Sequence, residues 1–171
     1  GVQTCALPIS LPVTSFTAID PPARTTATGV SWYAYPAPGN RDVRIAVVRA
    51  TGSGPHPTVL ILPGSDGLHD DYLRLARSYA DRGFDAVAGC WFAFPDPADR
   101  LRIDCSTAPG FTGVSEAAVG TLDALIAATQ QATGVNRAHL AIVGYSRGGG
   151  VALLHAARTG STLPIVDIAG M

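Results

Sequence analysis

The sequence predicts a single α/β domain built on a mostly parallel β-sheet. The chain of 171 residues is 47% hydrophobic, which is enough for one packed core. From residue 58 onward, apolar runs typical of buried strands alternate with amphipathic helical patterns, as in a parallel sheet flanked by helices. A glycine-rich turn at residues 144–150 also separates an apolar strand from a helix.

The first three strands can be placed by their patterns. Apolar and polar residues partly alternate over residues 30–35 and 43–48, and Pro38-Gly39-Asn40 supplies turn residues between them, which predicts an antiparallel hairpin. Residues 58–62, TVLIL, form an unbroken apolar run after the breaker cluster 52–57. A strand of this kind is buried on both faces, so we place it at the centre of the sheet.

The second half of the chain alternates helices and strands, and most of the helices end at a glycine. In chain order we expect a helix over 70–82, a strand over 84–92, a loop over 93–113, a helix from an N-cap at Ser115 to Gly134, a strand over 139–143, a helix over 151–158 and a strand over 164–169.

The chain divides into three parts of different character. Residues 1–9, GVQTCALPI, are the in-frame translation of a common sequencing-library adapter, so we expect them to be foreign to the natural protein. Residues 10–29 are rich in Ser, Thr and Pro and are predicted to be irregular. Residues 30–171 carry the domain, which we expect to be the N-terminal part of a longer one, truncated after about the sixth strand.

Charge and hydropathy argue against two classes of partner. The chain has 12 basic and 13 acidic side chains and no basic run, so we expect no binding to nucleic acid. Its longest apolar runs are far shorter than the roughly 20 residues that cross a bilayer, so we expect no membrane span. Secreted, periplasmic and cytoplasmic locations all stay open, as does the oligomeric state.

Two cysteines remain when the adapter residues are set aside. Cys90 and Cys105 flank a segment rich in Pro and Asp, and a disulfide between them would contribute about 3 kcal/mol by the loop-entropy model. The alternative is two unpaired cysteines that act as small hydrophobic side chains. The spacing does not decide between these two interpretations.

The motif that carries chemistry is Gly144-Tyr145-Ser146-Arg147-Gly148. It matches the G-x-S-x-G nucleophile elbow, in which small neighbours allow a tight strand-to-helix turn that holds the Ser in a strained, exposed conformation. The pattern alone is moderately specific. Its context raises the specificity, because an apolar strand ends immediately before Gly144 and a helical pattern opens immediately after Ser146.

A Ser nucleophile also needs donors for the oxyanion that forms during acyl transfer. One should be the backbone N–H of Arg147, at the positive end of the following helix. The other should come from the loop over residues 63–67, where we favour Ser65 and place Asp66 second. The competing interpretation of this segment is a plain strand-to-helix loop.

With these residues in view, the chain resembles the α/β-hydrolase superfamily and is most similar to its dienelactone hydrolase branch. The LPGSDGL loop and the GYSRGG elbow carry the resemblance, which spans about residues 30–171. It implies a three-layer α/β-hydrolase fold and a serine hydrolase that cleaves a small ester through an acyl-enzyme on Ser146. Dienelactone hydrolases proper carry Cys at that position, so a carboxylic ester or thioester is expected rather than dienelactone.

The same resemblance implies a triad in the order Ser, acid, His, with the acid after a later strand than any in this chain. We therefore expect the acid and the His beyond Met171, and little activity from the 171 residues alone. Two alternatives stay open. One is an acyl-CoA thioesterase or acyltransferase, and the other is a non-catalytic binding module with the same fold.

The polar residues near the end of the chain do not fill those triad positions. Among four histidines, only His155 follows Ser146, and it lies on the apolar stripe of the next helix, so we predict a packing residue. Asp167 lies inside the last strand and is predicted to make a strand-end polar contact.

Candidate substrate contacts are Asp66, His69 and Trp91. His69 follows the expected oxyanion loop and is either a substrate contact or a solvated loop residue. Trp91, with Phe92, lies at the end of a parallel strand and lines an acyl pocket or caps the core. The Arg147 side chain either holds an acidic substrate group or lies on the surface. Metal-ligand spacing and nucleotide-binding patterns are absent, so we expect no cofactor.

Overall fold

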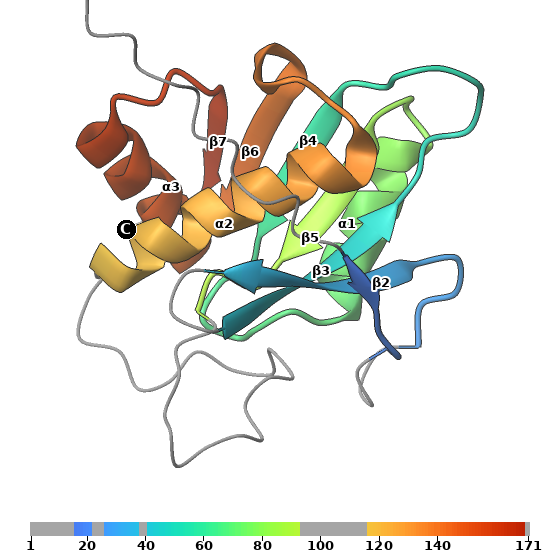
Figure 1. Ribbon diagram of the computed structural model, residues 1–171, viewed down its shortest axis with the longest axis horizontal. Helices are drawn as coiled ribbons and strands as arrows, with labels where there is room; N and C mark the ends of the chain where they lie inside the picture. The colour runs from blue at the N-terminus through green and yellow to red at the C-terminus, as the bar shows by residue number, and fades with distance from the viewer. Residues whose placement is uncertain (1–15, 22–25, 38–40, 93–115, 170–171) are drawn as a thin grey trace, which may run out of the picture.

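All six strands expected from the sequence occur in the computed structural model, which describes residues 16–21, 26–37, 41–92 and 116–169. The elements in chain order (Figure 1) are β1 (Thr17–Ala18), β2 (Ser31–Ala37), β3 (Arg41–Val48), β4 (Thr58–Leu62), α1 (Asp70–Ala80), β5 (Asp85–Gly89), α2 (Glu116–Thr133), a 3-10 turn (Arg137–His139), β6 (Leu140–Tyr145), α3 (Arg147–Thr159) and β7 (Ile165–Ile168). The short β1 is an addition, because it lies in the segment that we expected to be irregular.

The strands form one seven-stranded sheet in the order β1-β2-β3-β5-β4-β6-β7. The β1, β2 and β3 strands pair antiparallel, and β3 pairs antiparallel with β5. From β5 through β4 and β6 to β7 the pairing is parallel. The expected hairpin and the central position of β4 are therefore confirmed. The carboxyl ends of β4, β5 and β6 lie at the same edge of the sheet, which is where parallel α/β sheets form their sites.

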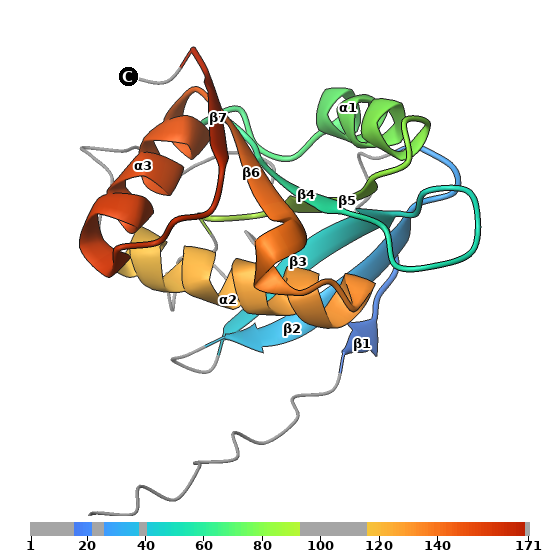
Figure 2. The same ribbon diagram turned by 90° about the horizontal axis from the view of Figure 1, so that it is seen from above.

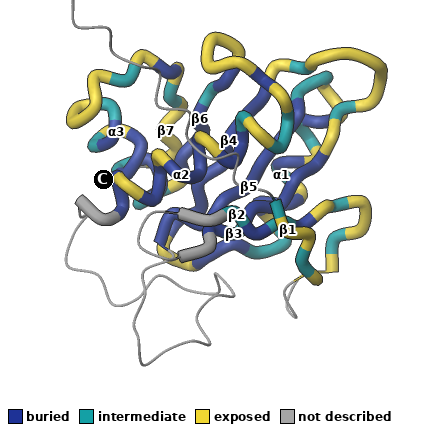
Figure 3. The backbone as a smooth tube through the Cα atoms, viewed as in Figure 1, coloured by how far each residue is buried: buried dark blue, intermediate teal, exposed yellow. Residues whose placement is uncertain are grey.

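The helices cover both faces of the sheet and make three layers. Figure 2 shows α1 on one face and α2 and α3 on the other. The α1 helix packs on β3, β4 and β5, whereas α3 packs on β6 and β7. Burial follows the same plan, since β4 and β5 are buried along their whole length and β7 is largely exposed (Figure 3). The fold is that of an α/β protein with one continuous core.

An ion pair joins the amino-terminal side of the sheet to the end of α2. The Arg49 guanidinium lies 2.7 Å from the carboxylate of Asp85, which is buried at the start of β5. The other oxygen of that carboxylate accepts a 2.9 Å hydrogen bond from the Ala50 N–H. Arg49 also donates to the carbonyl of Ala132 in the last turn of α2, where a cation complements the helix dipole. One side chain thus holds three elements together.

A second set of contacts ties the segment before β2 to α1. Asp70, the first residue of α1, accepts hydrogen bonds from the backbone and the hydroxyl of Thr26. These bonds lower the pKa of Asp70, with the bond from the Thr26 hydroxyl contributing most. On the next turns of α1, Arg77 donates to the carbonyl of Thr28. Among the described residues, no helix combines the length and the hydropathy that a bilayer crossing requires.

Three expected boundaries are wrong. The last helix begins at Arg147, directly after Ser146 as the elbow motif predicts, rather than at residue 151. Gly148 and Gly149 are buried in its first turn, where an added Cβ would clash, despite the low helix propensity of glycine. The strand expected over 84–92 ends at Gly89, and the helix expected over 70–82 ends at Ala80. The predicted turn at 38–40, the loop over 93–113, the Ser115 cap and residues 1–9 lie outside the described residues.

Candidate active site

Ser146 has the backbone conformation of a nucleophile elbow. It lies between the end of β6 and the first residue of α3, with φ of 50° and ψ of −121°. That region of the backbone map is costly for a residue with a Cβ, so the surrounding contacts must hold it there. The Ser146 N–H donates to the carbonyl of Ile168 at 2.8 Å, and its carbonyl accepts from the Gly149 N–H at 3.0 Å. Both neighbours of Ser146 in space, β7 and α3, thus fix the turn.

The small residues of the motif are required by close backbone contacts. A Cβ on Gly144 would lie 2.5 Å from the Gly149 Cα, so the strand and the helix could not cross as they do. A Cβ on Gly148 would lie 2.6 Å from the Pro63 carbonyl oxygen. A Cβ on Gly149 would overlap the carboxylate of Asp167. These glycines allow the helix to begin directly at the nucleophile.

The loop after β4 lies beside Ser146, as the oxyanion prediction requires. A Cβ built on Gly64 would lie 3.4 Å from the Ser146 Cβ. The loop turns at this point, because the Gly67 N–H donates to the Gly64 carbonyl at 3.3 Å. Ser65 is exposed at the outside of the turn, and Arg147 occupies the first turn of α3, where backbone N–H groups point out of the helix end. The structure therefore brings together the segments of both expected donors.

Trp91 supports this loop from inside the protein. It has no exposed surface, and its indole N–H donates to the Pro63 carbonyl at 2.6 Å. Its ring packs edge-on against Phe92, with centroids 5.0 Å apart. Of the two roles expected for Trp91, its burial fits the one of capping the core, and its hydrogen bond holds the loop. A substrate contact stays a prediction.

A hydrogen-bonded network that the sequence analysis missed connects the loop to α1. The Tyr72 hydroxyl accepts a hydrogen bond from the Gly64 N–H at 2.8 Å and donates to the Asp66 carboxylate at 3.0 Å. The other Asp66 oxygen lies 2.8 Å from Nε2 of His69. Tyr72 lies on the buried face of α1. Its position two residues inside the helix, directly after the loop, is the only sequence signal for the additional role.

The network changes the acidity of two of its members. Partial burial opposes ionisation of Asp66, but hydrogen bonds from His69 and Tyr72 outweigh this effect and lower its pKa. Burial raises the pKa of Tyr72 to about 12, and the nearby Asp66 charge acts in the same direction. The network therefore holds a carboxylate and a neutral phenol across the neutral pH range.

Both ring nitrogens of His69 form hydrogen bonds. Its Nδ1 accepts a hydrogen bond from the Asp71 N–H at 3.3 Å and so caps the start of α1. An accepting Nδ1 carries no proton, which makes Nε2 the protonated nitrogen that donates to Asp66. In this arrangement His69 has no nitrogen left to take a proton from Ser146. A substrate contact through the ring face stays a prediction.

The other three histidines lie in unrelated surroundings. His155 is buried between α2 and α3, where Nε2 lies 2.8 Å from an Asp123 carboxylate oxygen. The packing role is as expected, but the partner is a carboxylate, and Nδ1 has no hydrogen-bond partner among the described residues. His139 contacts Asn136 beside β6, and His56 precedes β4. No hydrogen bond among the described residues joins a histidine to Ser146.

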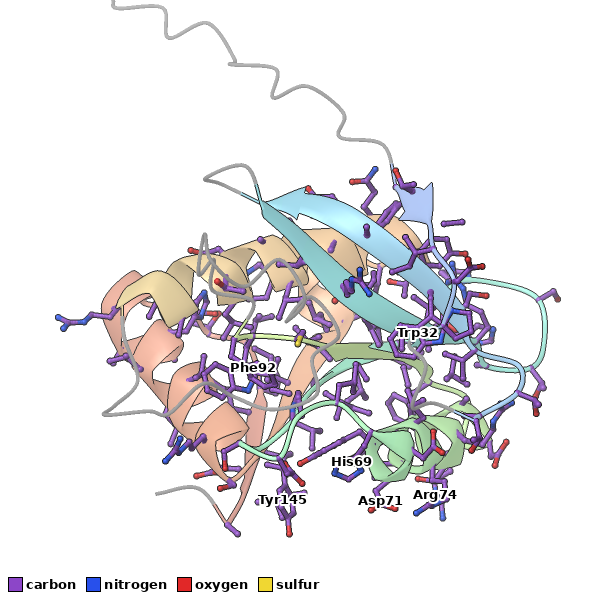
Figure 4. All side chains as sticks on the ribbon, turned by 90° about the horizontal axis from the view of Figure 1, so that it is seen from below. Trp32, His69, Asp71, Arg74, Phe92 and Tyr145 are labelled. Carbon is purple, nitrogen blue, oxygen red and sulfur yellow. The ribbon has the colours of Figure 1, made fainter. Side chains whose placement is uncertain are left out.

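An aromatic rim borders the nucleophile on the α1 side. Tyr145, directly before Ser146, is 44% exposed, and its ring packs edge-on against Tyr72 at 6.2 Å. Tyr72 in turn packs against His69 at 4.7 Å. Figure 4 shows Tyr145 and His69 on the same side of the molecule. Exposed aromatic surface here can contact the apolar part of a substrate.

Two further predictions concern residues around the site. Asp167 lies opposite Gly144 in the β6–β7 ladder, with its carboxylate against Gly149 of α3, so its contact is with the elbow helix. Cys90 is buried and disulfide-bonded. Because Cys5 and Cys105 both lie outside the described residues, the pairing with Cys105 stays a prediction. The described residues contain no cluster of three or more His, Cys, Asp or Glu side chains that could hold a metal ion.

Solved structures with a similar fold support the comparison with α/β-hydrolases. A dienelactone hydrolase-like promiscuous phosphotriesterase from metagenomic libraries is 24% identical with a TM-score of 0.64, and the match covers 83% of this chain and 60% of that one. A putative dienelactone hydrolase from Klebsiella pneumoniae is 21% identical with a TM-score of 0.55. That match covers 75% of this chain and 55% of the other. An α/β serine hydrolase without a lid from Xanthomonas campestris is 18% identical with a TM-score of 0.57. That match covers 84% of this chain and 62% of the other.

This chain therefore spans between about half and two thirds of the length of these structural neighbours. No curated protein sequence matches it significantly. The model of the dienelactone hydrolase family matches residues 43–165, a range that includes the loop after β4, the elbow and α3. Because that match covers well over half of the sequence, the chain belongs to the dienelactone hydrolase family.

Proposed function

We propose that the protein is a serine hydrolase that cleaves small carboxylic esters or thioesters through an acyl-enzyme on Ser146. The observation that carries this proposal is the positive φ of Ser146 at the junction of β6 and α3. A strained non-glycine residue at that junction has no structural benefit, whereas it raises a hydroxyl above the carboxyl edge of the sheet. Family membership adds support, because the family is one of hydrolases.

The chemistry follows from the groups around Ser146. Its Oγ attacks the acyl carbon and passes its proton to a base, and the carbonyl oxygen becomes an oxyanion that the Ser65 and Arg147 N–H groups bind. The bond to the alcohol or thiol leaving group then breaks, and that group takes up the proton. Water next attacks the acyl-enzyme and gives a proton to the base. The base returns that proton to the Oγ of Ser146 as the carboxylic acid leaves.

No histidine in the part of the chain that the structure describes is placed to act as the base. His69 has both nitrogens engaged, and His155 is buried against Asp123. We propose that the acid and the histidine of the triad belong to a part of the whole protein outside these 171 residues, as the greater length of the structural neighbours allows. A site without triad partners still accelerates acyl transfer about 10³–10⁴-fold over water through its oxyanion donors.

Covalent labelling of the whole protein, which carries the proposed base, tests the nucleophile. An alkyl fluorophosphonate reacts with a serine that a neighbouring base activates beside oxyanion donors, and intact-mass and peptide mass spectrometry identify the labelled residue. We expect one adduct, on Ser146, which disappears in Ser146→Ala and persists in Ser53→Ala, a change on an exposed loop. Labelling that is equal in Ser146→Ala and the parent chain would refute the proposed nucleophile.

Substrate class is tested on the whole protein, and the assignment of the base on the 171-residue chain. For the 171-residue chain, release of p-nitrophenol from p-nitrophenyl acetate at a rate well below that of an intact esterase would fit the proposal. A rate typical of an intact esterase would contradict the assignment of the base. Acyl-CoA cleavage without ester cleavage would favour a thioesterase or acyltransferase. Because one structural neighbour is a promiscuous phosphotriesterase, a phosphotriester belongs in the same panel. No Ser146-dependent reaction with any of them would favour a binding module.

A further inference from the structure

We propose that Tyr72 is a positioning residue for the oxyanion site, and that it acts with Asp66 by fixing the peptide bonds on either side of Gly64. This inference rests on the proposed function, because that function requires the Ser65 N–H as an oxyanion donor. Tyr72 lies close to the nucleophile without touching the reacting atoms. A Cβ built on Gly64 would be 3.3 Å from the Tyr72 hydroxyl and 3.4 Å from the Ser146 Cβ.

The peptide bond between Pro63 and Gly64 is held at both ends by side chains from two elements. Its carbonyl accepts from the indole N–H of Trp91, which follows β5. Its N–H donates to the hydroxyl of Tyr72, in α1. In a trans peptide the carbonyl and the N–H point in opposite directions, so two partners on opposite sides fix the plane of the bond.

The next peptide bond, between Gly64 and Ser65, is fixed by the turn. Its carbonyl accepts from the Gly67 N–H, which closes the turn, so its own N–H, that of Ser65, points away from the turn. No described residue accepts a hydrogen bond from the Ser65 N–H. Glycine at position 64 leaves this peptide free to rotate in the unfolded chain. In the folded chain, the turn and the side-chain clamp on the preceding peptide together determine where the Ser65 N–H points.

Asp66 sets the direction of the Tyr72 hydroxyl. A phenol has one proton, and when it donates that proton to the Asp66 carboxylate, its lone pairs are left for the Gly64 N–H. His69 donates to the second oxygen of the same carboxylate and holds it in place. Because the proton of Tyr72 is used by Asp66, the hydroxyl itself is not an oxyanion donor. Its effect on the reaction passes through Gly64 and Ser65.

The test is Tyr72→Phe, which removes one oxygen and keeps the ring that packs against His69 and Tyr145. We expect the first-order rate of Ser146 phosphonylation by the alkyl fluorophosphonate to fall by about 10- to 100-fold. Removal of a whole oxyanion donor typically lowers kcat by about 10²–10³-fold, so the expected effect is smaller or at most similar. The probe concentration at half-maximal rate should change little. The matched control is Tyr79→Phe, on the same helix, whose ring packs against Phe84 away from the loop.

Two readouts separate positioning from a general loss of structure. In amide NMR spectra, the Gly64 signal should shift and its hydrogen exchange should accelerate in Tyr72→Phe, while signals of β4 and β6 stay in place. Asp66→Asn keeps a carbonyl oxygen that can accept from Tyr72 and should retain most of the labelling rate. Asp66→Ala, which removes the acceptor, should approach the rate of Tyr72→Phe.

The outcomes distinguish this inference from the proposed function. If the whole protein is not labelled at Ser146, the proposed function fails, and the Gly64 signal still reports whether Tyr72 holds the loop. If it is labelled and folded Tyr72→Phe reacts at the same rate, the inference is overturned. An unchanged Gly64 signal in Tyr72→Phe would overturn it as well, whatever the labelling shows.

Discussion

Ser146 holds a backbone conformation that glycine would adopt without strain. A non-glycine residue in such a region costs about 1–3 kcal/mol, which the fold must supply. We therefore expect Ser146→Gly to be more stable than Ser146→Ala by about 1 kcal/mol, although both lose the nucleophile. Urea unfolding of the two variants measures this difference directly. Equal stabilities would mean that the elbow is not strained in solution.

Tyr72 should make the stability of the protein depend on alkaline pH. Burial raises its pKa from 10.0 to about 12, so the folded state binds the phenolic proton more tightly than the unfolded state does. The resulting stabilisation is complete below about pH 10 and is lost as the pH rises towards 12. Urea midpoints measured across this range should fall less steeply for Tyr72→Phe than for the parent chain. Tyr79→Phe, which leaves Tyr72 in place, should keep the parental slope.

Individual residues differ in how far the sequence predicts them. Ser146 is predictable because the glycines around it report a backbone constraint that few other structures share. The role of Tyr72 is not, because helical periodicity indicates that a side chain is buried and says nothing about what its terminal oxygen reaches. The contact of His155 with Asp123 is hidden for a related reason, since the two residues lie on different helices 32 positions apart.

Arg49 is the connection between elements that should matter most for stability. Its removal leaves the buried Asp85 carboxylate with the Ala50 N–H alone and leaves the last turn of α2 without its cation. Because the Arg49 side chain is about half exposed, we expect Arg49→Ala to cost about 1–3 kcal/mol, below the full value for a buried pair.

A matched control for this prediction is Arg74→Ala. Arg74 pairs with Asp71 on the surface of α1, and both side chains are mostly exposed (Figure 4). Its loss should change stability by less than about 0.5 kcal/mol. Denaturant unfolding of both variants checks the comparison, and equal effects would show that the junction of β5 and α2 does not depend on Arg49.

Among the elements, strands were predicted better than helix ends. Continuous apolar runs identify β4 and β6 because strands buried on both faces leave no other pattern. The elbow motif places the start of α3 directly after Ser146, where it lies, whereas the glycine run 148–150 favours a start at residue 151, since consecutive glycines are poor helix formers in isolation. The close approach of Gly148 to the carbonyl of Pro63 is a tertiary contact, and it overrides that preference without any trace in the local sequence.

The molecule as a whole exposes an apolar edge at β7. Val166 and Ile168 are 51% and 38% exposed and lie on one side of this outermost strand. An exposed apolar edge strand favours association between copies. We expect the 171-residue chain to self-associate as its concentration rises, and the double variant Val166→Arg/Ile168→Arg to remain monomeric at higher concentrations.

Sedimentation velocity at several concentrations tests this expectation. The control is Thr51→Arg/Ser53→Arg, which adds the same charge on an exposed loop. If both double variants suppress association equally, net charge rather than the β7 edge is responsible.

The overall architecture was predictable because every level of the sequence agrees with it. Apolar runs, turn residues and the glycine-rich motif all indicate the same α/β arrangement. The order of the strands within the sheet comes from the structure. The assembly of the loop after β4 was not predictable in detail, because it depends on Trp91 and Tyr72, which reach it from different elements.

The placement of Tyr72 and Ser146 on opposite layers has a consequence for how the protein loses activity on heating. Tyr72 belongs to a short helix on one face, Ser146 directly precedes a helix on the other, and the seven-residue loop between β4 and α1 lies between them. Fraying of that short helix would release the loop while the sheet stays intact. Loss of Ser146 reactivity on heating should then occur at a lower temperature than global unfolding. A preparation whose circular dichroism spectrum is native would already have lost that reactivity.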